Sequence, residues 1–318
     1  MVFNIHDEVR SNKRKSGLIM ILFFGFVISL GIITALIVSY FNHVPTIPAM
    51  IGGAVLAGVV AFLYLIFFYA MGPSMILSAT GAKPVSREHY PYLFHATETL
   101  AIAGGMSTVP QCYVIEDKAL NAYATGFSEK DSYVVVTTGL LEKLNRQEIE
   151  GVLAHEMSHI KNQDIKVMLY GAALLGATVL LAEIIFRIGL SSMHSNGGSS
   201  NDNKGAGLGI VLVVVGIVLM IFAPIIAQLM QLAISRKREY LADASGALLT
   251  RYPEGLASAL EKISNDTRIL KNVSKAAAPL FISSPFDADK HTETFFEKIF
   301  STHPPIDERI ARLRGKKV

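Results

Sequence analysis

Four long runs of apolar residues constrain this chain more than any other feature. They cover residues 17–41, 47–71, 167–188 and 208–233. Each run exceeds the roughly 20 residues that an α-helix needs to cross the hydrocarbon core of a bilayer. Charged residues make up 17% of the chain, fewer than in ordinary soluble domains, and they are nearly absent from these runs. We predict four membrane-spanning helices. The alternative for the third and fourth runs is a buried hairpin in a large soluble core.

The first run is too long for a cleaved signal peptide, whose apolar part usually has about 7–15 residues. Lys and Arg gather in the N-terminal tail and after the fourth run, whereas the turn between the first two runs has none and the loop 191–207 has only Lys204. Positive charge favours the cytoplasmic side. The predicted order is a cytoplasmic tail (1–16), a membrane hairpin (17–71), a cytoplasmic region (72–166), a second hairpin (167–234) with an outer loop (191–207), and a cytoplasmic region (235–318).

The two polar regions mix helices with short strands. Helical patterns cover residues 87–104, 140–144 and 146–161, and the last of these has Asn145 as N-cap and Glu148 at the capping-box position. Residues 109–115 and 132–138 are rich in residues that favour strands, and 120–126 is a loop or a weak edge strand. After the fourth run we expect helix to about residue 263, broken near Tyr252-Pro253, and a final helix from about 303 to 314. The fold class is a mainly α integral membrane protein with a small β-sheet.

His155 and His159 carry the strongest chemical signal. They lie four residues apart in a predicted helix, so both imidazoles project from one face, as two ligands of a tetrahedral zinc ion must. Glu156 is offset by about 100° and is placed to act as general base and then as proton donor to the leaving amine. The competing interpretation is two surface histidines beside an unrelated glutamate.

A catalytic zinc site needs a third protein ligand, and Glu239 is the candidate. His159 lies just before the third apolar run and Glu239 just after the fourth, so an antiparallel membrane hairpin would hold both at a similar height above the lipid. Asp164 is too close along the same helix to turn back onto the metal. Asp243, four residues after Glu239, is the candidate carboxylate that accepts the second N–H of a metal-bound histidine. An ordinary charged helix next to the membrane is the alternative.

Three segments together resemble the HtpX family of membrane metalloproteases, which are relatives of the CAAX prenyl proteases. They are residues 155–159, residues 235–243 and the stretch from Asn121 to Gly126, and the resemblance covers nearly the whole chain. It implies a cytoplasmic zincin-like protease domain at a bacterial inner membrane, with Glu239 as the third zinc ligand.

The resemblance also implies roles for further residues. Asn121, Ala122 and Tyr123 would lie beside the cleft, where an extended peptide can add to the sheet edge. His303 would stabilise the tetrahedral oxyanion, and Arg309 would pair with Asp243. The family further implies quality control of misfolded or damaged membrane proteins.

Other functional classes fit less well. There is no basic stripe interleaved with aromatic residues, so nucleic acid is not an expected partner. No phosphate-binding glycine loop is present, so we expect proteolysis without a nucleotide. The alternatives kept open are a processing protease of narrow specificity and a zinc-binding membrane scaffold without activity. The expected cofactor is one Zn²⁺ per chain, with cobalt or manganese less favoured.

Overall fold

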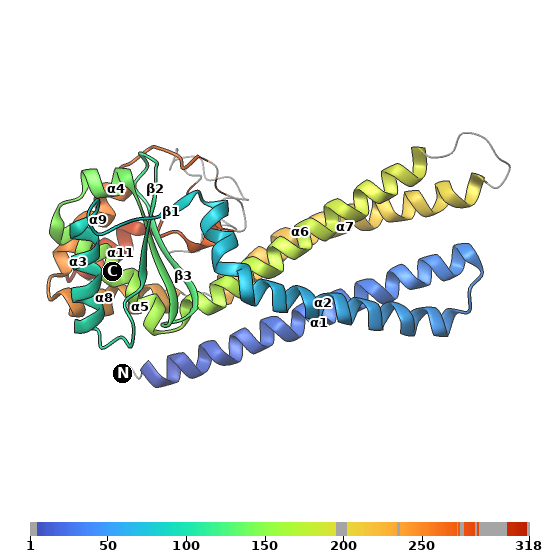
Figure 1. Ribbon diagram of the computed structural model, residues 1–318, viewed down its shortest axis with the longest axis horizontal. Coiled ribbons are helices and arrows are strands. Elements are labelled where there is room, and N and C mark those ends of the chain that lie inside the picture. The colour runs from blue at the N-terminus through green and yellow to red at the C-terminus, as the bar shows by residue number, and fades with distance from the viewer. Residues whose placement is uncertain are drawn as a thin grey trace. The chain divides into compact units, whose positions relative to one another are not determined.

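The computed structural model describes residues 5–194, 202–233, 236–271, 273, 277–283, 285 and 304–316. The chain divides into two compact units. We call Met1–Ser16, Met71–Ala172 and Leu229–Val318 the mixed unit, and Gly17–Ala70 and Ala173–Gln228 the helical unit. Four long helices run through the helical unit, and the mixed unit holds the sheet and the shorter helices (Figure 1).

The long helices are α1 (Ile5–Asn42), α2 (Thr46–Ala79), α6 (Asp164–His194) and α7 (Asp202–Ala233). Within the described residues, three segments are long and apolar enough to cross a membrane: Arg14–Ile37, Thr46–Ala79 and Asp164–Met193. The fourth predicted run is helical, but its described apolar stretch, Gly207–Phe222, is shorter. The apolar runs therefore form helices as predicted, and three of these helices contain a candidate membrane span among the described residues.

Close helix packing inside the helical unit depends on small residues. A Cβ atom added at Gly31 of α1 would lie 2.6 Å from the carbonyl oxygen of Gly53 in α2, so only glycine allows this approach.

On α6, Arg187 donates from Nε and Nη2 to Oε1 of Glu183, at 3.0 and 2.6 Å. These two charges therefore neutralise each other.

A four-stranded sheet forms one layer of the mixed unit. The strands are β1 (Ala82–Pro84), β2 (Gln111–Ile115), β3 (Ala122–Ser128) and β4 (Asp131–Thr137), in the order β1-β2-β4-β3. β2 and β4 pair in parallel, and the other two pairs are antiparallel. The predicted strands at 109–115 and 132–138 are confirmed, and the ambiguous stretch 120–126 is resolved as β3, which occupies an edge of the sheet.

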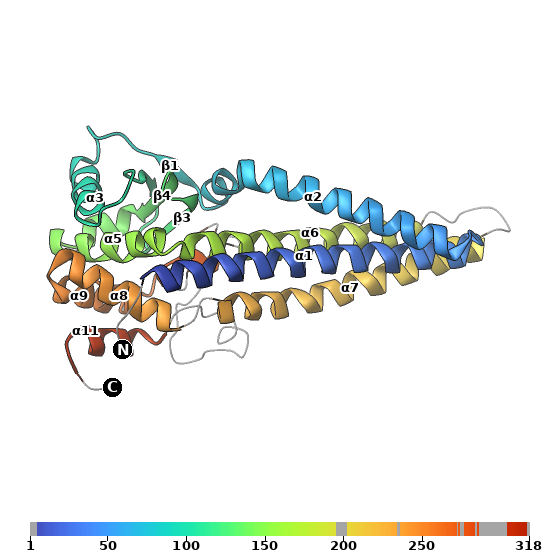
Figure 2. The same cartoon turned by 90° about the horizontal axis from the view of Figure 1, so that it is seen from below.

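Helix α5 (Arg146–Lys161) is the centre of the mixed unit. In Figure 2 it lies between the sheet and the pair α8 (Arg236–Thr250) and α9 (Pro253–Ser264), and it contacts β3, β4, α8 and α9. Helices α3 (Pro91–Ala103), α4 (Thr138–Lys143) and α11 (Ile306–Leu313) and the 3₁₀ turn η1 (Ala278–Leu280) complete the unit. The predicted break near Tyr252-Pro253 separates α8 from α9 because proline lacks the N–H that would continue α8.

The main core of the mixed unit is built around α5. Leu140, Val152, Leu153, Ile160 and Leu256 are fully buried there. The predicted capping box is present: the side chain of Asn145 accepts from the Glu148 N–H at 3.0 Å, and the Asn145 N–H donates to Glu148 Oε2 at 2.7 Å. Local capping and apolar burial therefore fix the start and the orientation of the helix that carries the His-Glu motif.

Candidate active site

Helix α5 buries both histidines of the motif together with Glu156. Every residue from Gly151 to Ile160 is buried, because the sheet and two helices surround this part of α5. Helix α8 comes very close: a Cβ atom at Gly246 would lie 3.0 Å from the backbone nitrogen of His155. This close approach brings the acidic residues of α8 next to the imidazoles of α5.

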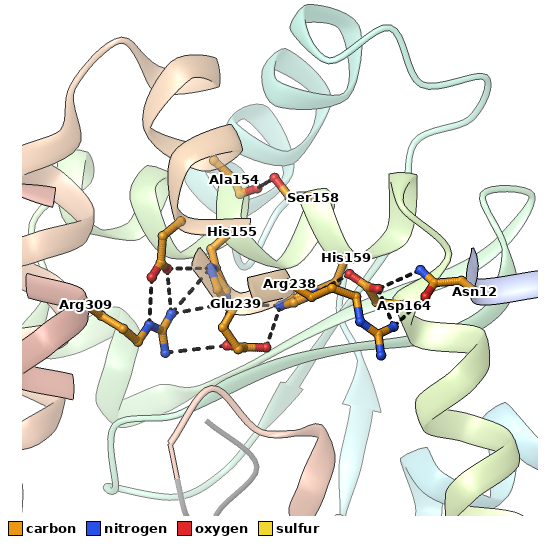
Figure 3. A network of polar contacts seen from close by, with 10 residues as sticks. Asn12, Ala154, His155, Ser158, His159, Asp164, Arg238, Glu239 and Arg309 are labelled. Atoms are coloured by element: carbon orange, nitrogen blue, oxygen red, sulfur yellow. Dashed lines mark hydrogen bonds and ion pairs between the residues drawn. The ribbon is translucent and has the colours of Figure 1, made fainter. Parts of the chain in front are cut away.

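Three donor atoms meet between α5 and α8, as Figure 3 shows. The Nε2 atoms of His155 and His159 lie 3.2 Å apart. The carboxylate of Glu239 places Oε2 at 3.8 Å from Nε2 of His155 and Oε1 at 3.4 Å from Nε2 of His159. All three side chains are buried, and their ligand atoms lie within 4.8 Å of one another. The residues predicted from the two sides of the second hairpin thus converge.

Asp243 and Arg309 lie behind His155. Nδ1 of His155 is 3.0 Å from Oδ1 of Asp243. Arg309, on α11, donates to the same carboxylate in a bidentate manner, from Nε to Oδ2 at 2.9 Å and from Nη2 to Oδ1 at 2.7 Å. Asp243 and Arg309, which were predicted to pair, are therefore in contact. The Asp243 carboxylate can hold the proton of His155 on Nδ1, which leaves Nε2 with a free electron pair for a metal ion.

Asp164 lies against His159 in the same way as Asp243 lies against His155, a contact that the sequence did not predict. Its Oδ2 atom lies 2.9 Å from Nδ1 of His159. The sequence predicts that Asp164 continues the same helix, but α5 ends at Lys161 and Gln163 takes the left-handed conformation with φ 58°. That reversal lets Asp164, the first residue of α6, turn back beneath His159. The spacing of five residues after His159 was the one available signal.

The Asp164 carboxylate has two more partners, and no sequence pattern indicates either of them. Arg238 donates from Nη1 to Oδ1 of Asp164 at 2.9 Å, and Asn12 donates from Nδ2 to the same oxygen at 2.8 Å. Both side chains are buried. In the sequence alone, Arg238 belongs to a basic flank of the membrane and Asn12 to the N-terminal tail.

The electrostatic surroundings separate the two histidines. Burial lowers the pKa of His155 to about 4, and the nearby Arg309 guanidinium adds to this effect. Burial also acts to lower the pKa of His159, but the charges of Glu239 and Asp164 outweigh it and raise the pKa to about 9. A metal ion that binds Nε2 of His159 at neutral pH must therefore displace a proton from this imidazole.

These residues fit a divalent metal ion. Two imidazoles and one carboxylate are a donor set that catalytic zinc sites use, with the fourth position left open. Each imidazole has a carboxylate on its other nitrogen, an arrangement that is typical of metal-bound histidines. Within the part of the chain that the structure describes, this is the group of three or more such residues that can hold a metal.

The predicted substrate residues lie at the start of β3. Nδ2 of Asn121 donates to the carbonyl of Ser283 at 2.9 Å, and the Ile282 N–H donates to the carbonyl of Ala122 at 2.9 Å. The Tyr123 side chain is fully buried, with its hydroxyl 2.7 Å from Oγ1 of Thr80 and its ring against Phe281. The chain's own segment 281–283 thus covers part of this sheet edge. His303 lies outside the described residues.

Comparison with known proteins identifies the family of the chain. The model of peptidase family M48 matches residues 89–317. A protein named protease HtpX homolog from Dictyoglomus turgidum is 40% identical over 98% of this chain and 95% of its own length. Homologs with the same name from Caldanaerobacter subterraneus and Streptococcus pneumoniae are 41% and 36% identical, each over 98% of this chain and 97% and 99% of theirs.

Among solved structures, Ste24p of S. mikatae matches with a TM-score of 0.44 and 21% identity, over 84% of this chain and 65% of that chain. The sequence match to the Dictyoglomus protein covers nearly the whole chain, including its apolar helices. The chain therefore belongs to peptidase family M48, and it is a membrane metalloprotease.

Proposed function

We propose that this metalloprotease is a zinc-dependent endopeptidase with one zinc ion per chain, held by His155, His159 and Glu239. The proposal is carried by one observation: three buried donor atoms converge while a carboxylate faces Nδ1 of each histidine. Imidazole donors favour zinc over manganese. When bound, the metal supplies a Lewis acid for the scissile carbonyl and lowers the pKa of the attacking water.

Glu156 is our candidate for the general base. It follows His155 on the same buried helix and is 3% exposed. Its charge helps to raise the pKa of both His159 and Arg309, so it lies within electrostatic reach of the two sides of the site. From this position its carboxylate accepts the proton of the attacking water and returns it to the leaving amine. Asp243 and Asp164 keep the imidazoles oriented throughout.

The substrate would bind as an extended peptide along the edge of β3. In antiparallel pairing the backbone groups of alternate residues face the neighbouring strand. Asn121 bonds to Thr137 of β4, so Ala122 and Ala124 face outward. Because Ile282 already bonds to Ala122, we infer that peptide pairing begins at Ala124. Asn121 would then act at the end of the peptide, and His303 remains our proposed stabiliser of the oxyanion.

We place the site at the cytoplasmic face of a bacterial inner membrane, because Lys and Arg concentrate beside the mixed unit and are scarce in the short loops. Misfolded or damaged membrane proteins are the proposed substrates. Backbone pairing at a sheet edge reads few side chains of the substrate. This feature favours broad specificity over the alternative of a narrow processing enzyme.

A zinc-binding scaffold without activity is the second alternative. A purely structural site usually fills all four metal positions with protein ligands. Among the described residues three ligands converge, and Glu156, a buried carboxylate outside this ligand set, follows the first of them. Activity and metal content must therefore be measured on the same samples.

The full chain would be purified in detergent with a chelator, and cleavage of an unfolded membrane protein followed after zinc is added. The variant E156Q should keep zinc and lose at least ~100-fold in rate. E239A should lose zinc itself. Glu150 lies on α5 too, where Tyr92 donates to it at 2.8 Å, so E150Q is the matched control and should cut normally. Wild-type rates in E156Q would remove it as the base, and full zinc content in E239A would remove Glu239 as a ligand.

A further inference from the structure

Asn12 is an unusual residue for the entrance of a membrane helix, because its side chain is completely buried. It lies on α1, two residues before the candidate span Arg14–Ile37. Its neighbours along the helix, Arg10 and Arg14, are exposed. A buried amide is costly unless its hydrogen bonds are made, so its partners indicate what it does.

Each polar atom of the Asn12 side chain is used. Nδ2 donates to the carbonyl of Asn162 and to Oδ1 of Asp164, both at 2.8 Å. Oδ1 accepts from Nη1 of Arg238 at 2.6 Å. An amide is the side chain that supplies donors and an acceptor at this point; a carboxylate of the same shape would face the Asp164 carboxylate and the Asn162 carbonyl with no proton to donate.

These bonds connect α1 to a histidine of the site through one carboxylate, as Figure 3 shows. Oδ1 of Asp164 accepts from Asn12 and Arg238, while Oδ2 lies 2.9 Å from Nδ1 of His159. The carboxylate cannot rotate without giving up one of these contacts. Arg238 is also the residue before Glu239, so the same cluster adjoins a second candidate ligand.

We propose that Asn12 is a positioning residue of the metal site. It holds Asp164 in the orientation that keeps Nε2 of His159 directed at the metal, and so the first membrane helix takes part in the active site as well as anchoring it. The inference rests on the proposed metal site. Asn12 is not one of the three candidate ligands, and it acts on His159 through Asp164.

A simple anchoring role for Asn12 makes a different prediction. An anchor would change the stability of the mixed unit and leave zinc affinity unchanged once the protein is folded. A positioning residue would change zinc affinity, and its effect would depend on the residue at position 164. The measurement is therefore the dissociation constant of zinc, by competition with a chelator, on the full chain in detergent.

N12D and N12A should raise the zinc dissociation constant about 10–100-fold, with N12D the weaker binder because it places two carboxylates together. Ser16, one turn along the same face of α1, is also buried, and its hydroxyl makes no hydrogen bond among the described residues. S16A should therefore stay within about twofold of the parent. If N12D does not fold, N12A carries the test, since alanine removes the bonds without adding charge.

The exchange N12D with D164N sharpens the test. In the double variant the new amide at position 164 could donate to the new carboxylate at position 12 and still accept from His159. The zinc dissociation constant of the double variant should therefore be at least about fivefold lower than the value predicted by multiplying the two single effects. Two outcomes would overturn the positioning role and leave the proposed metal site intact. In the first, the effects of N12D and D164N on the zinc dissociation constant are additive. In the second, the dissociation constants of N12D and N12A stay within twofold of the parent while H159A abolishes zinc binding. Unchanged zinc binding in H159A would instead overturn the proposed metal site, and this inference with it.

Discussion

Replacing Arg309 by methionine should weaken the protein and its metal site together. Arg309 is fully buried and makes a bidentate ion pair with Asp243. Burial alone would raise the pKa of Asp243, but Arg309 and His155 hold it at about 2, against an ordinary value of 3.8. At about 1.4 kcal/mol per pH unit, the surroundings stabilise the charged carboxylate by roughly 2–3 kcal/mol.

Without Arg309 that carboxylate stays buried with His155 as its main partner. Breaking one side of a buried pair typically costs about 3–5 kcal/mol, so we expect R309M to lower the free energy of unfolding by about that amount. Arg309 also fixes the Asp243 carboxylate that lies against Nδ1 of His155. Its removal frees this carboxylate to move, and we expect the affinity for zinc to fall about 10–100-fold, as is typical when the partner of a metal-bound histidine is disturbed.

The single cysteine offers a direct assay of unfolding. Cys112 is buried in β2, and burial raises the pKa of its thiol, so labelling should require opening of the mixed unit. Labelling against denaturant gives the free energy of unfolding, and chelator competition gives the zinc affinity. R314M is the control: Arg314 pairs with Glu254 and Glu261 nearer the surface, where water screens the ion pairs, so its loss should change the free energy of unfolding far less. R309M matching R314M in both measurements would refute the reasoning.

Two further predictions concern helix α5. Zinc must displace a proton from His159, whose pKa is raised to about 9, while His155 is already neutral above about pH 4. The apparent affinity for zinc should therefore rise about tenfold per pH unit between about pH 6 and 8. An affinity that does not change with pH in chelator competition, or zinc binding without proton release in calorimetry, would contradict this. A Cβ at Gly151 would lie 2.6 Å from the Leu256 nitrogen, so G151A should force α5 from α9 and cost about 1–3 kcal/mol. Gly176 has open space around it, so G176A is the control, and equal melting temperatures for the two variants would speak against tight α5–α9 packing.

The features that the sequence determined by itself are local or periodic. The apolar runs require helices because of their length, and the helix of His155 and His159 begins where Asn145 and Glu148 form the capping box. The four-residue spacing of the histidines needs no tertiary contact to place both on one face. Glu239 could be predicted as the third ligand because a membrane hairpin holds the two helix ends that flank it at a common height. Residues far apart along the chain can therefore lie close together in space.

The tertiary structure alone decided what surrounds these ligands. Asp164 reaches His159 because Gln163 reverses the chain, a backbone choice that no pattern in the sequence announces. Asn12 lies 152 residues from Asp164 and 226 from Arg238 along the chain, yet hydrogen-bonds to both. Such contacts depend on the packing of whole elements against one another, and a polar residue shows its role only once its partners are in place. The same holds at β3, where residues 281–283 cover the edge at Ala122. The metal ligands could thus be read from spacing, while the groups that orient them became visible only in the folded chain.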